Sequence, residues 1–139
     1  MSHKGVSSSL LKINFPKIVD ARGNLTYLQH PQHIPFEIKR VFWTYDVPGG
    51  QIRGGHAYRT QQEIIIALSG SFDVVVTNRY QNTHRVTLNR SYHGVLLPAM
   101  TWRHMENFST NAVALHISDQ DYNESDYIRD FEQFLCKFQ

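Results

Sequence analysis

Residues 63–77 read Glu-Ile-Ile-Ile-Ala-Leu-Ser-Gly-Ser-Phe-Asp-Val-Val-Val-Thr, and this stretch decides the fold class. The apolar run from Ile64 to Leu68 is long enough for one buried strand. Ser69-Gly70-Ser71 is typical of a tight turn, and the β-branched run after it is typical of a second strand. The stretch therefore predicts two consecutive strands joined by a short turn.

The same alternation of strand and turn signals extends along most of the chain. Further strands are predicted at residues 38–45, 85–88, 94–97 and 112–117, with weaker candidates at 10–15 and 24–28. Turn signals recur roughly every ten residues, which favours a sandwich or a barrel. No linker or internal repeat interrupts the pattern, so residues 1–139 are expected to form a single all-β domain.

The C-terminal segment departs from this pattern. Its apolar residues fall at helical spacing, which predicts a C-terminal α-helix. They are Tyr127, Ile128, Phe131, Phe134, Leu135 and Phe138. Asn123 or Ser125 is the expected N-cap, and Asp126 suits the positive first turn. Cys136, the one cysteine, is expected to be a small packing residue on the apolar face of this helix.

Composition excludes several classes of function. The net charge is +2, and no basic stripe alternates with aromatic residues, so nucleic-acid binding is not expected. A single cysteine cannot form an internal disulfide, and no apolar run reaches the roughly 18 residues of a membrane span. Residues 1–9 are polar and serine-rich, which predicts a flexible N-terminus and not a signal peptide. The cytoplasm is therefore the expected location.

Two segments contain the candidate functional residues. The first is Arg53-Gly54-Gly55-His56-Ala57-Tyr58, with Glu63 and Gly70 beyond it, and the second is Gly94–Pro98, followed by Trp102, Arg103, His104 and Asn107. This pair resembles the two motifs of the cupins, except that Tyr58 replaces the second histidine of His-x-His. Residues two apart on a strand share a face, so His56 and Tyr58 are expected to line the mouth of a small barrel.

Structural explanations stay open for several of these residues. His56 is either a functional group or a satisfied structural histidine, and Tyr58 either acts in the site or packs. Glu63 faces solvent or pairs with a cation, whereas Trp102 belongs to the core or to the pocket wall. His104 is expected from a strand on the opposite side. The remaining histidines lack partner spacing and are expected to be surface or packing residues: His3, His30, His33, His84, His93 and His116.

Five blocks extend the resemblance to a specific family. They are Asp20–Leu25, Ile34–Val41, Arg53–Ala57, Pro98–Trp102 and Asn123–Arg129. In order and spacing these blocks resemble the dTDP-4-keto-6-deoxyhexose 3,4-ketoisomerases of deoxysugar biosynthesis, over nearly the whole chain. The resemblance implies a cupin or jelly-roll barrel with a C-terminal helix, a homodimer, and a dTDP-linked keto sugar as substrate.

The resemblance also implies a chemistry and a set of roles. The ketone moves from C4 to C3 through an enediol, with neither a metal nor a cofactor. This reaction needs an acid/base group and donors beside the developing oxyanion. His56 and Tyr58 are the expected catalytic residues. The expected substrate-binding residues are Arg22, Arg53, Arg103, Trp102, His104 and Glu63.

Departures from the family pattern keep two alternatives open. A tyrosine of ordinary pKa, about 10, is a poor base at neutral pH, so Tyr58 allows a nucleotide-sugar-binding cupin with altered or lost catalysis. A metal-dependent cupin using His56, Glu63 and His104, with Tyr58 as a weak fourth ligand, is the other alternative. Arg22 together with Arg103 matches neither common pairing in the family, so the configuration of the product at C4 is not predicted.

Overall fold

The computed structural model describes residues 11–139. Leu10 and the polar segment 1–9 lie outside this range, so the expectation of a flexible N-terminus is not tested. Of the strand predicted at residues 10–15, the described part forms β1 (Leu11–Asn14).

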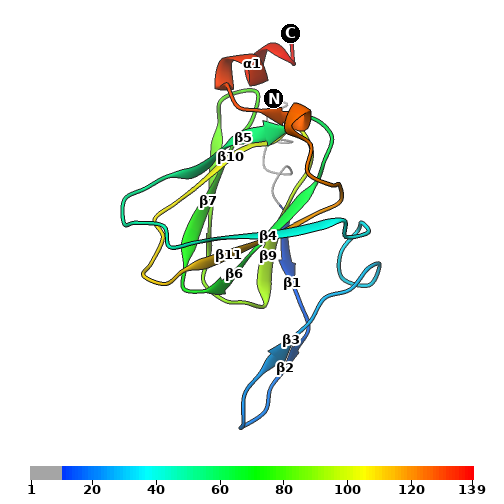
Figure 1. The fold of residues 1–139 in the computed structure, drawn as a ribbon, viewed down its shortest axis with the longest axis vertical. Helices are drawn as coiled ribbons and strands as arrows, with labels where there is room; N and C mark the ends of the chain where they lie inside the picture. The colour runs from blue at the N-terminus through cyan, green and yellow to red at the C-terminus, as the bar shows by residue number, and fades with distance from the viewer. Residues whose placement is uncertain (1–10) are drawn as a thin grey trace.

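Two antiparallel five-stranded sheets face each other and form the body of the molecule (Figure 1). The first sheet has the order β1, β9 (His93–Leu97), β6 (Glu63–Ser69), β11 (Val113–Ser118) and β4 (Arg40–Tyr45). The second has the order β12 (Tyr127–Ile128), β5 (Arg53–Tyr58), β10 (Trp102–Glu106), β7 (Phe72–Thr77) and β8 (Thr83–Leu88). The all-β jelly-roll prediction is confirmed, although over residues 11–139 the strands form two sheets and not one closed hydrogen-bonded barrel.

The isoleucine run of β6 is buried because both faces of the first sheet are covered. Ile65 and Ala67 point into the core between the sheets, where they join Val74, Leu97 and Met105. Ile64 and Ile66 point to the other side, into a second cluster with Phe15, Ile34 and Phe36. Because both faces of β6 pack against apolar clusters, its side chains need not alternate between apolar and polar, which explains the continuous apolar run in the sequence.

A two-stranded arm, β2 (Lys17–Ile18) with β3 (Leu25–Thr26), extends away from the sheets (Figure 1). Its apolar residues Ile18, Val19 and Leu25 are all more than half exposed. Arg22 lies in the turn between the two strands and pairs with Asp20 at 2.9 Å.

The C-terminal helix is shorter than predicted. A single turn of 3₁₀ helix, η2 (Glu124–Asp126), is capped by Asn123, and Tyr127 and Ile128 then form a strand. The α-helix α1 spans only Phe131–Cys136 and is capped by Asp130. The prediction that Tyr127 and Ile128 are helical is therefore wrong, because β12 pairs with β5 and this pairing overrides the local periodicity.

Phe131 and Phe134 of α1 cover the outer face of the second sheet, where they pack against Trp102. Cys136 is exposed, so its predicted packing role is wrong. In residues 11–139, no helix has the length and apolar character that crossing a membrane would require.

Candidate active site

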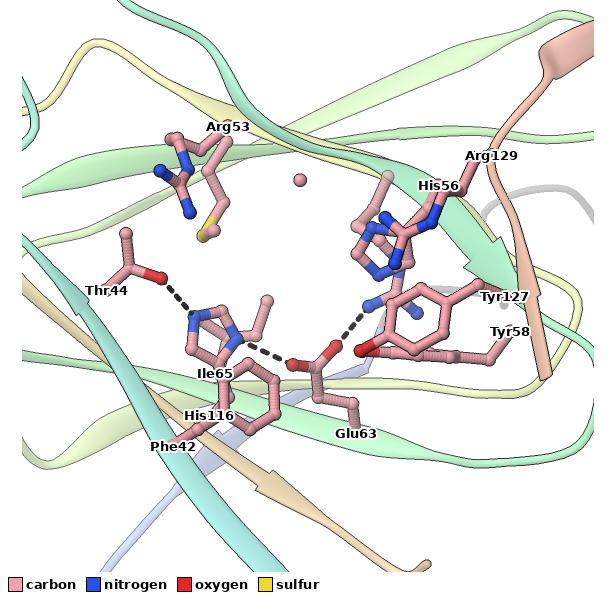
Figure 2. A pocket seen from close by; sticks show the side chains of 13 residues that line it. Phe42, Thr44, Arg53, His56, Tyr58, Glu63, Ile65, His116, Tyr127 and Arg129 are labelled. Carbon is pink, nitrogen blue, oxygen red and sulfur yellow. Dashed lines mark hydrogen bonds and ion pairs between the residues drawn. The ribbon is translucent and has the colours of Figure 1, made fainter. Parts of the chain in front are cut away.

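A cavity of about 240 Å³ opens between the two sheets (Figure 2). Strands β4, β6 and β11 of the first sheet and β5, β10 and β12 of the second supply its walls. The lining residues are Phe42, Thr44, Arg53, Gly54, His56, Tyr58, Glu63, Ile65, Arg103, Met105, His116, Tyr127 and Arg129. Five of the eight predicted site residues therefore meet here: Arg53, His56, Tyr58, Glu63 and Arg103.

A β-bulge aims two of these residues into the same cavity. Arg53 and His56 are three positions apart, so on a regular strand they would face opposite sides. The register between β5 and β10 shifts, because Arg103 pairs with His56 whereas Met105 pairs with Arg53. Gly54 in this bulge has φ +76°, a conformation that side chains disfavour. The glycines of the first motif thus allow both Arg53 and His56 to line the cavity.

His56 has a free nitrogen at the cavity. Its ring packs edge-on against Tyr58, with centroids 4.7 Å apart, and lies 5.1 Å from Tyr127. Its Nε2 is buried and has no hydrogen-bond partner in the described chain. Burial, together with the charge of Arg103, lowers the pKa of His56 to about 3. The imidazole is therefore neutral near pH 7, so one of its nitrogens is an unprotonated acceptor.

Arg103 and Glu63 form a buried ion pair that joins the two sheets. Arg103 Nη1 donates to Glu63 Oε1, and the guanidinium lies over the Tyr58 ring at 4.9 Å. Burial opposes ionisation of Glu63, but the nearby His116 and Arg103 prevail and lower the pKa of Glu63 to about 2. Arg103 Nη2 is buried and lacks a partner in the described residues. An unpaired buried cationic donor is costly, which makes it a candidate contact for a ligand.

Two tyrosines close one end of the cavity. Tyr58 OH donates to Tyr127 OH at 3.3 Å, and Arg129 lies over the Tyr127 ring at 4.2 Å (Figure 2). Burial, the Glu63 carboxylate and the bond to Tyr127 raise the pKa of Tyr58 far above its usual value. Tyr58 thus keeps its proton at neutral pH and cannot serve as a base.

The other three predicted site residues lie elsewhere. Arg103 points into the cavity from β10, so its neighbours Trp102 and His104 point to the outer face of the sheet. Trp102 packs against α1, and His104 Nε2 bonds Glu106 Oε1 at 2.9 Å. β10 is also the immediate neighbour of β5 and not a strand on the opposite side. Arg22 is on the extended arm and does not line the cavity of its own chain.

The proposed metal ligands are not brought together. His104 is on the opposite face of β10 from the cavity, and both oxygens of Glu63 are already bonded to Arg103 and His116. Within residues 11–139, no group of three or more histidine, cysteine or acidic side chains is arranged to hold a metal ion. The ligand set of the metal-dependent alternative is therefore not assembled.

Comparison with known proteins agrees with this geometry. The model of the family described as WxcM-like, C-terminal (FdtA) matches residues 9–139. The chain belongs to this family. It is 34% identical over 122 residues to the TDP-4-oxo-6-deoxy-alpha-D-glucose-3,4-oxoisomerase of Aneurinibacillus thermoaerophilus, covering 88% of this chain and 87% of that protein.

Solved structures of similar proteins lead to the same family. A 3,4-ketoisomerase from Helicobacter canadensis is similar with a TM-score of 0.88 and 37% identity, over 92% of this chain and 96% of that one. A mutant of the 3,4-ketoisomerase from Thermoanaerobacterium thermosaccharolyticum, in complex with TDP-4-keto-6-deoxyglucose, is similar with a TM-score of 0.90 and 28% identity, over 93% of each chain. The resemblance drawn from the sequence blocks is thus confirmed.

Four polar residues that line this WxcM-like cavity were not predicted as site residues: Thr44, His116, Tyr127 and Arg129. Of the two predicted alternatives for His116, surface or packing, the buried side chain fits packing, and nothing in the sequence indicated that its Nδ1 lies 2.6 Å from Glu63 Oε2. Thr44 lines the cavity from β4, next to His116. Tyr127 was assigned to a helix. The block Asn123–Arg129 was the available signal for Tyr127, because a generic cupin does not require it.

Proposed function

We propose that this chain is a sugar 3,4-ketoisomerase that moves the ketone of a TDP-linked 4-keto-6-deoxyhexose from C4 to C3. Family membership and the similar 3,4-ketoisomerases support this reaction. One observation of the site supports it most strongly. The cavity has an unpaired buried base, His56 Nε2, and an unpaired buried cationic donor, Arg103 Nη2.

These two atoms match what enediol chemistry requires. His56 takes the proton from C3, and the electron pair of that bond forms the C3–C4 double bond. Negative charge then develops on the C4 oxygen, where Arg103 stabilises it. The protonated His56 returns the proton to C4, the C4 oxygen gains a proton and the C3 hydroxyl loses one, and the ketone is left at C3. Since Arg103 supplies the electrophile, the proposed reaction needs no metal.

The cavity limits which part of the substrate it encloses. Its volume of about 240 Å³ is below the range of roughly 300–1,000 Å³ that holds a drug-sized ligand. The hexose is therefore proposed to occupy the cavity, and the nucleoside diphosphate to lie outside its mouth. Arg53 and Arg129 are exposed side chains at the cavity, and we assign the diphosphate to them.

A homodimer is part of the proposal. The arm places exposed Ile18 and Leu25 in solvent, and a groove of about 310 Å³ on the outer face of the first sheet is lined by apolar residues such as Ile38 and Leu115. A second copy can cover both surfaces. Arg22 reaches substrate only if the arm of one subunit extends to the cavity of the other.

The second candidate is a nucleotide-sugar-binding protein with lost catalysis. The raised pKa of Tyr58 favours it, because Tyr58 replaces a histidine and is unable to accept a proton. In this case the protein binds the sugar nucleotide but does not exchange the C3 proton.

Incubation with TDP-4-keto-6-deoxyglucose in D₂O, followed by NMR, separates the two candidates. We expect deuterium at C3 and a 3-keto product, both slowed by about 10²–10⁴ in His56→Ala, the usual contribution of a positioned acid or base. Binding of the sugar nucleotide should persist in this variant, because the arginines remain. Wild-type binding without exchange would instead establish the second candidate.

A further inference from the structure

A continuous hydrogen-bonded chain crosses the inner face of the first sheet. Glu63 Oε2 lies 2.6 Å from His116 Nδ1, and His116 Nε2 lies 3.1 Å from Thr44 Oγ1 (Figure 2). The three residues are on the adjacent strands β6, β11 and β4. His116 pairs with Ile65 on one side and with Phe42 on the other, so Glu63 and Thr44 are its diagonal neighbours.

This chain has the order of a carboxylate–imidazole–hydroxyl relay. In such relays the carboxylate orients the imidazole, and the far nitrogen exchanges a proton with the hydroxyl. The His116 ring is fixed by stacking on Phe42, with centroids 4.4 Å apart and planes 1° from parallel. Glu63 and His116 are buried, whereas Thr44 is partly exposed and lines the cavity. The hydroxyl is therefore the end of the relay that a ligand can touch.

Ketone transfer requires a second proton path besides the one at carbon. When C3 loses its proton to His56, the oxygen on C4 must gain a proton, and the oxygen on C3 must later lose one. A neutral imidazole has a single acceptor nitrogen, which the carbon-bound proton occupies on His56 during this interval. Tyr58 already donates its hydroxyl proton to Tyr127. The oxygen-bound proton therefore needs another carrier.

We propose that Thr44 is a catalytic residue that carries the oxygen-bound proton, with His116 and Glu63 positioning it and storing the proton. In the first half of the reaction, Thr44 Oγ1 gives its proton to the oxygen on C4 and regains one from protonated His116 Nε2. In the second half, Thr44 takes the proton from the oxygen on C3 and returns one to His116. All three residues end in their starting state, so no oxidant or reductant is needed.

This assignment rests on the proposed ketoisomerase function and deepens it. It gives the chain a second acid/base group although Tyr58 replaces the second histidine of the motif. The competing explanation is structural: Thr44 and His116 only satisfy each other's hydrogen-bonding needs inside the sheet. A structural role predicts that replacing Thr44 affects folding and all partial reactions together.

The test compares Thr44→Val, Thr44→Ser and wild type with TDP-4-keto-6-deoxyglucose in D₂O. Thr44→Val keeps the shape and removes the hydroxyl, whereas Thr44→Ser keeps the hydroxyl. Thr83→Val is the matched control, because Thr83 is an exposed strand threonine on β8. NMR gives the rate of deuteration at C3 and, separately, the rate of product formation. Thermal unfolding reports the effect of each variant on the fold.

We expect Thr44→Val to slow product formation by about 10²-fold, with a smaller loss of exchange at C3, so that the ratio of exchange to product rises at least about tenfold. Thr44→Ser should restore the ratio, and Thr83→Val should not change it. An unchanged ratio in Thr44→Val, with or without a loss of stability, overturns the relay while the ketoisomerase function stands. A wild type with neither exchange nor product overturns both.

Discussion

His56 and Tyr58 occupy the same face of β5, but their environments give them opposite protonation behaviour. Burial makes the charged form of each group unfavourable. For His56 this means a neutral imidazole, and for Tyr58 a phenol that keeps its proton. In the proposed mechanism His56 is therefore the acceptor of the pair and Tyr58 a donor. Two histidines at these positions would not be assigned to separate acceptor and donor roles in this way.

The depressed pKa of His56 makes stability depend on pH. Its pKa is about 3 in the folded chain and about 6.5 when unfolded, so the unfolded chain binds more protons between these values. Stability due to His56 is complete above pH 6.5 and falls on acidification toward pH 3. We expect wild type to lose about 2 kcal/mol more than His56→Gln between about pH 7 and pH 5 in urea unfolding.

Glu63 does not obscure this comparison. Its pKa is lowered from 4.5 to about 2, so its stabilisation is complete above pH 4.5 and is lost only below that value. Equal losses in wild type and His56→Gln between about pH 7 and pH 5 would contradict the depressed pKa of His56.

Tyr58→His tests whether the tyrosine limits turnover. A neutral histidine at this position has an unprotonated acceptor nitrogen, which the protonated phenol of Tyr58 lacks. We expect turnover of TDP-4-keto-6-deoxyglucose to rise by about tenfold, given the usual contribution of an acid/base group. Tyr58→Phe is the control, because it keeps the ring and removes only the hydroxyl that bonds Tyr127. A decrease in Tyr58→His equal to that in Tyr58→Phe would show that the hydroxyl itself is required.

At the scale of elements, the segment Asn123–Arg129 is held in place by side-chain hydrogen bonds more than by strand pairing. β12 pairs with β5 through only two residues. Asp126 compensates, because its buried carboxylate accepts from Thr60 N and Oγ1 at 2.9 and 2.7 Å and from Gln61 N and Nε2 at 3.2 and 3.3 Å. This anchor holds Tyr127 and Arg129 at the cavity.

We therefore expect Asp126→Asn to loosen this segment. An amide replaces a charged acceptor, and the loss should be about 1–3 kcal/mol in the free energy of unfolding. Backbone amides of residues 123–129 should exchange faster with deuterium, and KM should rise as Arg129 leaves the cavity. Asp121→Asn makes the same chemical change at an exposed position and should behave as wild type. Unaltered exchange in Asp126→Asn would show that the two-residue strand suffices.

The elements differ in how far sequence predicts them. The sequence from Glu63 to Thr77 was sufficient to predict two strands and the turn between them, because the signals for strand burial and for the turn come from residues that are neighbours in the sequence. The bulge at Gly54 was not predictable, since it depends on the register with β10. His116 was missed for the same reason: Glu63, its partner, is 53 residues away. The family resemblance gave Arg103, which does line the cavity, whereas strand alternation, which was not applied to residues 102–104, would have excluded Trp102 and His104 from the same face.

At the scale of the whole molecule, the extended arm has little contact with the two sheets to stabilise it. A two-stranded ribbon with exposed apolar residues is marginally stable by itself. We expect light scattering to give twice the mass of one chain at micromolar concentration, because a second copy would bury this surface in the proposed dimer. Leu25→Asp should shift the protein toward monomer and lower turnover if Arg22 serves the partner's cavity. Ile52→Asp, at another exposed apolar position, should stay dimeric.

The bulge in β5 also determines which mutations this site tolerates. An inserted residue changes the phase of side-chain alternation, and everything before it points to the other side. Deleting Gly55 would leave Arg53 and His56 two positions apart on a regular strand, so both would still face the cavity. A residue other than glycine at position 54 would instead disfavour the bulge without changing the length of the strand. In a regular strand of that length Arg53 would turn outward, whereas His56 and Tyr58 would keep their places, and the proposed diphosphate contact would be separated from the proposed acid/base group.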